Sequence, residues 1–115
     1  MREVSYEGMG QVTVTMKTEG VVLKGDVVKV AASDTVSRCA AGEGFCGVAQ
    51  TDGRDGCVAV QISGCCQVLC ATAPAVGYQK LTADGTNGVK TGTATDREVL
   101  VLAVDAGAKC ATVKL

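Results

Sequence analysis

The most regular stretch of the sequence is 57–62, which reads Cys-Val-Ala-Val-Gln-Ile. Its larger apolar side chains, Val58, Val60 and Ile62, fall on every second residue. Successive side chains of a β-strand point to opposite faces of its sheet, so this spacing is typical of a strand with one buried face. Val and Ile also favour strands because their branched side chains are stiff at χ1. The stretch therefore predicts a half-buried strand with these three side chains in the core.

Similar segments follow one another along the chain, separated by turn signals such as Asp84-Gly85 and Asn87-Gly88. Extended segments are expected at 11–16, 27–31, 35–39, 45–49, 57–62, 65–70, 78–82, 89–91, 98–104 and 110–115. The nearly continuous apolar run in 98–104 is typical of a strand that is buried on both sides. We therefore expect an all-β protein: a small single-domain antiparallel β-barrel or sandwich of about eight to ten short strands, over 11–115. An extended N-terminal arm, 1–10, precedes it.

The composition agrees with this fold class and excludes several functions. Val, Ala, Gly and Thr make up 61 of the 115 residues, and Leu only six, so the core must consist of small branched side chains. The net charge of −1 argues against a nucleic-acid partner. The absence of histidine removes the Ser-His and Cys-His nucleophile pairs and every zinc site with a His ligand. No apolar run approaches the roughly 18 residues of a membrane span, so no membrane partner is expected.

The seven cysteines leave three interpretations open. They can be small buried hydrophobic residues, disulfide partners, or a metal or redox group. The N-terminal residues lack the apolar segment of a secretory signal, so we expect synthesis in a reducing cytoplasm, where disulfides are rare. The sequence has no C-x-x-C pair, and the adjacent Cys65 and Cys66 would point to opposite faces of a strand. We therefore expect no metal site and no other cofactor.

No motif for catalysis is found either. Most of the acidic residues lie in turns, where an Asp side chain usually bonds its own backbone. Gly42-x-Gly44-x-x-Gly47 matches a dinucleotide-binding pattern formally, but no helix is expected after it. We expect a protein that is not an enzyme and has no catalytic residue.

The order of several short segments is more informative than any one of them. They are Tyr6–Gly10, Gly25–Val28, Phe45–Ala49, Val58–Gly64, Gly77–Leu81, Asp84-Gly85, Gly88–Lys90, Arg97–Leu102 and Ala111–Leu115. From residue 6 to the C-terminus, this series resembles the small capsid decoration, or head cement, proteins of tailed phages and prophages of gut bacteria. The cysteines depart from that pattern, because Ala, Val or Tyr is common at their positions.

The resemblance implies a structural protein of the virion, made in the cytoplasm of the host bacterium. Such proteins sit on the outside of the capsid, often as homotrimers at three-fold positions, and clamp neighbouring subunits of the major capsid protein. We expect Val4, Tyr6 and Met9 of the arm to contact the capsid or a neighbouring copy, unless the arm is only a frayed terminus. The alternatives are another β-barrel interaction module, such as a phage tail, baseplate or ligand-binding domain, and a cysteine-based metal or redox protein.

Overall fold

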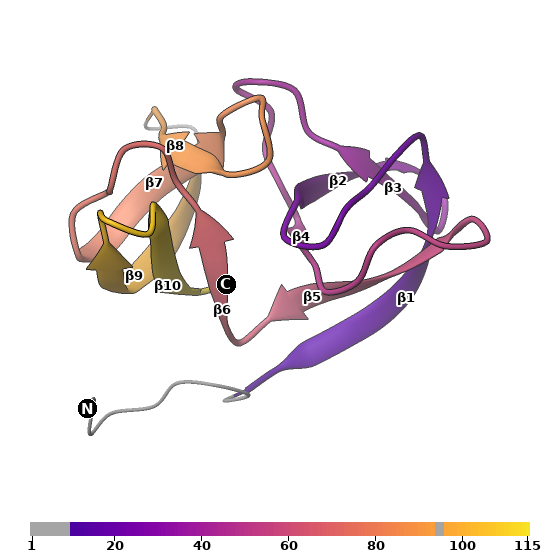
Figure 1. Ribbon diagram of the computed structural model, residues 1–115, viewed down its shortest axis with the longest axis horizontal. Coiled ribbons are helices and arrows are strands. Elements are labelled where there is room, and N and C mark those ends of the chain that lie inside the picture. Colours follow the sequence, from indigo (N-terminus) through magenta and orange to yellow (C-terminus); the bar gives the residue numbers. More distant parts are fainter. Residues whose placement is uncertain (1–9, 94–95) are drawn as a thin grey trace.

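The computed structural model describes residues 10–93 and 96–115 (Figure 1). These residues form ten short strands and no helix, which confirms the all-β class and the upper end of the expected strand number. Every segment expected to be extended overlaps one of the strands. They are β1 (Val12–Glu19), β2 (Val27–Ala32), β3 (Thr35–Arg38), β4 (Gly47–Ala49), β5 (Cys57–Ser63), β6 (Cys65–Leu69), β7 (Gly77–Ala83), β8 (Val89–Thr91), β9 (Arg97–Asp105) and β10 (Cys110–Lys114).

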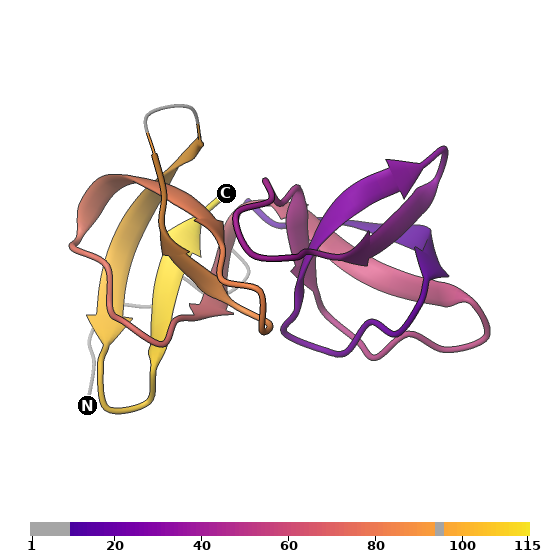
Figure 2. The same ribbon diagram turned by 90° about the horizontal axis from the view of Figure 1, so that it is seen from above.

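The strands are divided between two lobes, which Figure 2 shows side by side. The N-terminal lobe, 10–63, is a closed barrel with the strand order β1-β3-β2-β4-β5. The C-terminal lobe, 65–115, is a five-stranded sheet with the order β6-β10-β9-β7-β8. All pairs are antiparallel except one: β1 and β3 run parallel from Lys17 to Glu19. The fold is therefore antiparallel as expected, apart from this one seam, where the first barrel closes.

Two groups of buried side chains form the core. One lies inside the first barrel and consists of Val22, Val28, Val36, Ala49, Val58 and Val60. The other fills the C-terminal lobe and continues into the N-terminal lobe, where Val27, Cys39, Phe45 and Val48 belong to it. Because these residues of the first lobe are buried in the core of the second, the two lobes form one domain.

The lobes are joined at Gly64, between β5 and β6. The backbone N–H of Leu115 donates to the Gly64 carbonyl oxygen at 3.0 Å. Gly64 has a φ of +88°, and a Cβ there would lie 2.6 Å from the carbonyl carbon and oxygen of Gly10. Only glycine fits this position, because a side chain would be strained and would also overlap backbone. Gly10, which precedes β1, and Leu115, which follows β10, therefore both contact Gly64 at the link between the lobes.

The alternation expected for β5 holds only for its first half. Val58 and Val60 are buried in the barrel, but Ile62 is exposed and Gln61 is buried. Thr13 pairs with Gln61 and Val12 with Ser63, so a β-bulge leaves Ile62 without a partner on β1. The prediction of Ile62 in the core is therefore wrong.

Strand β9 also differs from its prediction. Val99 and Val101 are buried, whereas Leu100 and Leu102 are only half-buried and Val104 is exposed. The strand has a core face and an outer face, because only one side of its sheet is packed against the core. It is not buried on both sides.

Candidate functional site

The arm residues expected to contact a partner, Val4, Tyr6 and Met9, lie outside the described residues. The structure does show where the arm joins the folded body. Gly10 packs against Gly64, at the link between the lobes.

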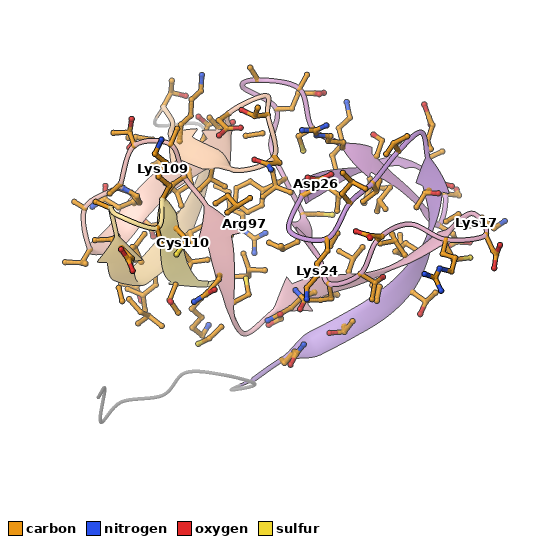
Figure 3. The ribbon with its side chains drawn as sticks, in the orientation of Figure 1. Lys17, Lys24, Asp26, Arg97, Lys109 and Cys110 are labelled. Atoms are coloured by element: carbon orange, nitrogen blue, oxygen red, sulfur yellow. The ribbon has the colours of Figure 1, made fainter. Side chains whose placement is uncertain are left out.

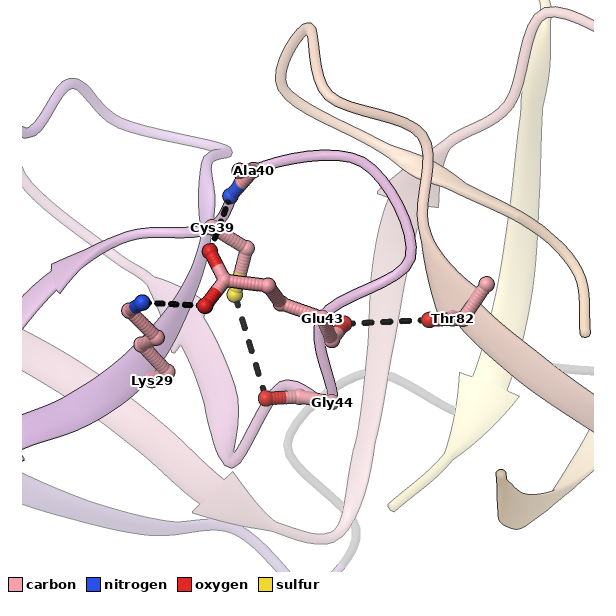
Figure 4. A network of polar contacts seen from close by, with 6 residues as sticks. All are labelled: Lys29, Cys39, Ala40, Glu43, Gly44 and Thr82. Atoms are coloured by element: carbon pink, nitrogen blue, oxygen red, sulfur yellow. Dashed lines mark hydrogen bonds and ion pairs between the residues drawn. The ribbon is translucent and has the colours of Figure 1, made fainter. Parts of the chain in front are cut away.

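A network of polar contacts lies where the loop 39–46, which joins β3 to β4, reaches β7 of the second lobe (Figure 4). The carboxylate of Glu43 accepts hydrogen bonds from the Lys29 ammonium and from the backbone N–H of Ala40. Its backbone oxygen accepts from the hydroxyl of Thr82 at 3.0 Å and from the N–H of Ala83 at 3.1 Å, both on β7. The hydrogen bond to Lys29 holds the pKa of Glu43 below its ordinary value, and the same bond raises the pKa of Lys29. These hydrogen bonds hold the loop in place, and they engage both oxygens of the Glu43 carboxylate.

A second contact between the lobes involves Arg97, the first residue of β9. Its side chain lies between the lobes (Figure 3), with the guanidinium carbon 5.6 Å from the centre of the Phe45 ring. A guanidinium over an aromatic face at this distance is a favourable cation–π contact. One guanidinium nitrogen also donates to the backbone oxygen of Cys46 at 3.3 Å. Arg97 therefore stabilises the same loop at Phe45 and Cys46.

All seven cysteines are free. Cys39, Cys65 and Cys70 are buried, as expected of small hydrophobic residues, whereas Cys57 at the start of β5 is exposed. Burial raises the pKa of both Cys39 and Cys66 to about 11. Such thiols are almost fully protonated at neutral pH and are therefore weak nucleophiles.

Metal binding has little support in the described part of the chain. No three side chains of the His, Cys, Asp or Glu type gather there closely enough to hold an ion. A disulfide between Cys39 and Cys46 would have to span β2, because the Cys39 N–H bonds Val27 on one side of that strand and the Cys46 N–H bonds Val28 on the other. Two strand spacings are about 9.6 Å, beyond the Cα separation of a disulfide.

An open depression of about 430 Å³ lies over β1, β5 and the loop that follows β4. Its polar groups include the side chains of Thr51, Asp52 and Arg54. Two of them already bind backbone: the Thr51 hydroxyl accepts from the N–H of Ala59 at 3.3 Å, and Asp52 accepts from the N–H of Lys24 at 2.8 Å. These contacts hold the loop in place and are typical of a structural role.

Exposed apolar side chains are spread over both lobes. The most exposed are Val21 at 74%, Tyr78 at 69%, Val76 at 60% and Val30 at 59%. Tyr78 lies on the outer face of the second sheet, opposite Leu100 of β9. Single exposed hydrophobic residues of this kind are common on protein surfaces and need no partner to explain them.

No family model matches the chain, and no curated protein is significantly similar to it. The described residues contain no helix long and apolar enough to span a membrane.

Proposed function

We propose that this protein is a non-enzymatic structural protein of a tailed-phage or prophage virion. It decorates the exterior of the capsid and stabilises it by binding subunits of the major capsid protein, as a homotrimer. It is made in the host cytoplasm and acts on the capsid surface.

The main support is the ordered series of segments that resembles the decoration proteins, together with an all-β body that such a role suits. Most of these segments coincide with strands or with the turns before them: Phe45–Ala49 contains β4, Val58–Gly64 covers most of β5, and Arg97–Leu102 begins β9. The resemblance therefore follows the framework of the fold and is not confined to its loops.

The physical properties of the body favour binding to a repetitive surface. Its lobes share a core and are fastened at Glu43 and Arg97, so little conformational entropy is lost when the body binds. A capsid presents many identical sites, so weak contacts made by an oligomer add up. An arm that leaves the body at Gly10 can reach a neighbouring subunit, because nine extended residues span about 30 Å.

The test is co-sedimentation with empty heads assembled from the major capsid protein encoded in the same genome. We expect the full chain to sediment with the heads at saturating stoichiometry, and native mass spectrometry to show a metal-free trimer of three times 11.6 kDa. If the full chain stays in the supernatant, the proposed function is wrong.

The arm is tested with a matched pair of tyrosines. Replacing Tyr6→Ser, or deleting residues 2–9 so that Gly10 stays in place, should lower the bound fraction at least about tenfold, the equivalent of one lost contact of moderate strength. Tyr78→Ser removes the exposed tyrosine of the body and serves as the control, with binding expected to stay unchanged. Full binding after the deletion would show that the arm is only a terminus.

A further inference from the structure

The two lobes have the same strand order when five is added to the number of each strand in the first lobe. Read from β1, the first barrel runs β1-β5-β4-β2-β3, and the second sheet runs β6-β10-β9-β7-β8. Each of the four antiparallel pairs in the first lobe has its antiparallel counterpart in the second. Many five-stranded orders are possible, so a complete match is strong evidence of a common plan.

The residue-by-residue register agrees as well. Val60 faces Val14 across β5 and β1, and 53 residues later Val113 faces Cys66 across β10 and β6. The hairpin pair Val30 and Val36 likewise returns as Ala83 and Val89. The pair β7–β9 is shifted by two residues relative to β2–β4, a shift that keeps the same faces inward.

The same positions supply the two cores. Five of the six buried residues inside the first barrel have a counterpart in the core of the second lobe, 52 or 53 residues further on. The matched pairs are Val28 with Leu81, Val36 with Val89, Ala49 with Val101, Val58 with Ala111, and Val60 with Val113. Only two of these pairs keep the same residue, which is why the repeat is inconspicuous in the sequence.

Special backbone positions recur in the same way. Gly25 and Gly77 have φ angles of +91° and +96° at the entry to β2 and β7. Gly56 and Lys109 have φ angles of +77° and +55°, and each directly precedes a cysteine that begins the last strand of its lobe. A lysine in this left-handed conformation is uncommon, and it is understandable where a glycine stands in the other copy.

We infer that the chain is a tandem duplication of one five-stranded barrel. Its two copies are related by an approximate two-fold axis, and they meet where Gly10 and Gly64, which lead into β1 and β6, touch each other. The copies differ mainly at one seam. In the first lobe β1 and β3 pair in parallel, whereas β6 ends at Leu69, where the Leu69 carbonyl oxygen lies against Gly88 just before β8. The inference concerns the body and does not depend on the proposed function.

The two-fold relation makes a specific demand on connectivity: the lobes must be able to exchange their order. The test is a variant with residues 1–9, then 64–115, one serine, and finally 10–63. It keeps all residues of the chain. Gly64 then takes the place of Gly10 after the arm. The new link Leu115-Ser-Gly10 copies the native link Ile62-Ser63-Gly64.

We expect this variant to unfold cooperatively with a Tm within about 5 °C of the parent chain, because the strands and the contacts between the lobes are kept and only the joins before Gly64 and before Gly10 are new. A control variant has a flexible linker of about six Gly and Ser residues in place of the single serine, long enough to join ends that are not related by symmetry. If only the control variant folds, or if neither does, the duplication with a two-fold axis is refuted. Folding is the readout, so failure to bind capsids leaves this test unaffected.

Discussion

The link between the lobes gives the sharpest prediction, because one buried side chain spans it. Gln61 is 2% exposed, and its amide nitrogen donates to the backbone oxygens of Ser63 and Cys65, each at 3.0 Å. Gln61→Met keeps the size of the side chain and removes both bonds. The half-buried Ser63 bond is worth about 1 kcal/mol, and leaving the buried Cys65 oxygen without a partner costs about 1–3 kcal/mol. The free energy of unfolding should fall by roughly 2–4 kcal/mol.

For a domain of this size that loss corresponds to a Tm lower by about 8–16 °C. Thermal and urea unfolding followed by far-UV circular dichroism measures it. Gln67→Met is the matched control, because Gln67 is exposed on β6 and its replacement should cost less than about 0.5 kcal/mol. If the two variants are equally stable, Gln61 does not hold the link.

A second variant of the same residue adds a pH signature. Gln61→Glu places a carboxylate against two carbonyl oxygens in a buried site, which raises the pKa of the new group above its unfolded value of about 4.3. The folded state then favours the protonated form, so the variant should gain stability relative to the parent as the pH falls from 7 to 5. A stability difference that is the same at both pH values would refute this reasoning.

Three further outcomes are expected. Burial acts to raise the pKa of Asp84, but hydrogen bonds from the N–H groups of the following turn outweigh it and hold the pKa below its ordinary value. Asp84 therefore stabilises the fold above its unfolded pKa of about 3.9 and ceases to do so as the pH falls through the lower folded value. In an acid titration, the free energy of unfolding of Asp84→Asn should therefore fall less steeply than that of the parent chain. In native protein at pH 8, iodoacetamide should modify the exposed Cys57 at least about tenfold faster than Cys39 or Cys66, whose pKa values are about 11; equal rates by peptide mass spectrometry would contradict the burial. Gly64→Ala should lower Tm by more than about 8 °C, because it combines a strained φ with overlap of the Gly10 backbone; a parent-like melting curve would show that the link is open.

The strands could be predicted from the sequence because their signal is local. Alternation in 11–16 and 57–62 and the turn residues between segments located all ten strands to within a few residues. What could not be predicted depends on partners far away in the sequence. Ile62 is exposed because of a bulge opposite Val12, and the parallel seam at Lys17 depends on the return of β3 to β1.

The candidate contacts between the lobes were missed for the same reason. Glu43 and Thr82 are 39 residues apart, and Arg97 reaches a loop more than 50 residues earlier. Neither has a signature in its own neighbourhood. A comparison of the two halves of the chain could have found the repeat, because Cys57 and Cys110 both begin a strand of alternating small apolar residues. The substitutions between the halves, such as Leu81 for Val28, hide it from a search for identical motifs.

The parallel seam of the first barrel has a consequence for behaviour at high density. Each of its five strands pairs with a neighbour on both sides for at least part of its length, so no strand of this lobe is an edge along its whole length. Proteins held close together at high local concentration are under particular pressure to avoid such edge-to-edge pairing, which leads to aggregation. In the C-terminal lobe the end strands β6 and β8 are only five and three residues long, and such short edge strands disfavour pairing with another chain. Closure of the first barrel and the short end strands of the second sheet both limit edge-to-edge pairing between copies of the chain.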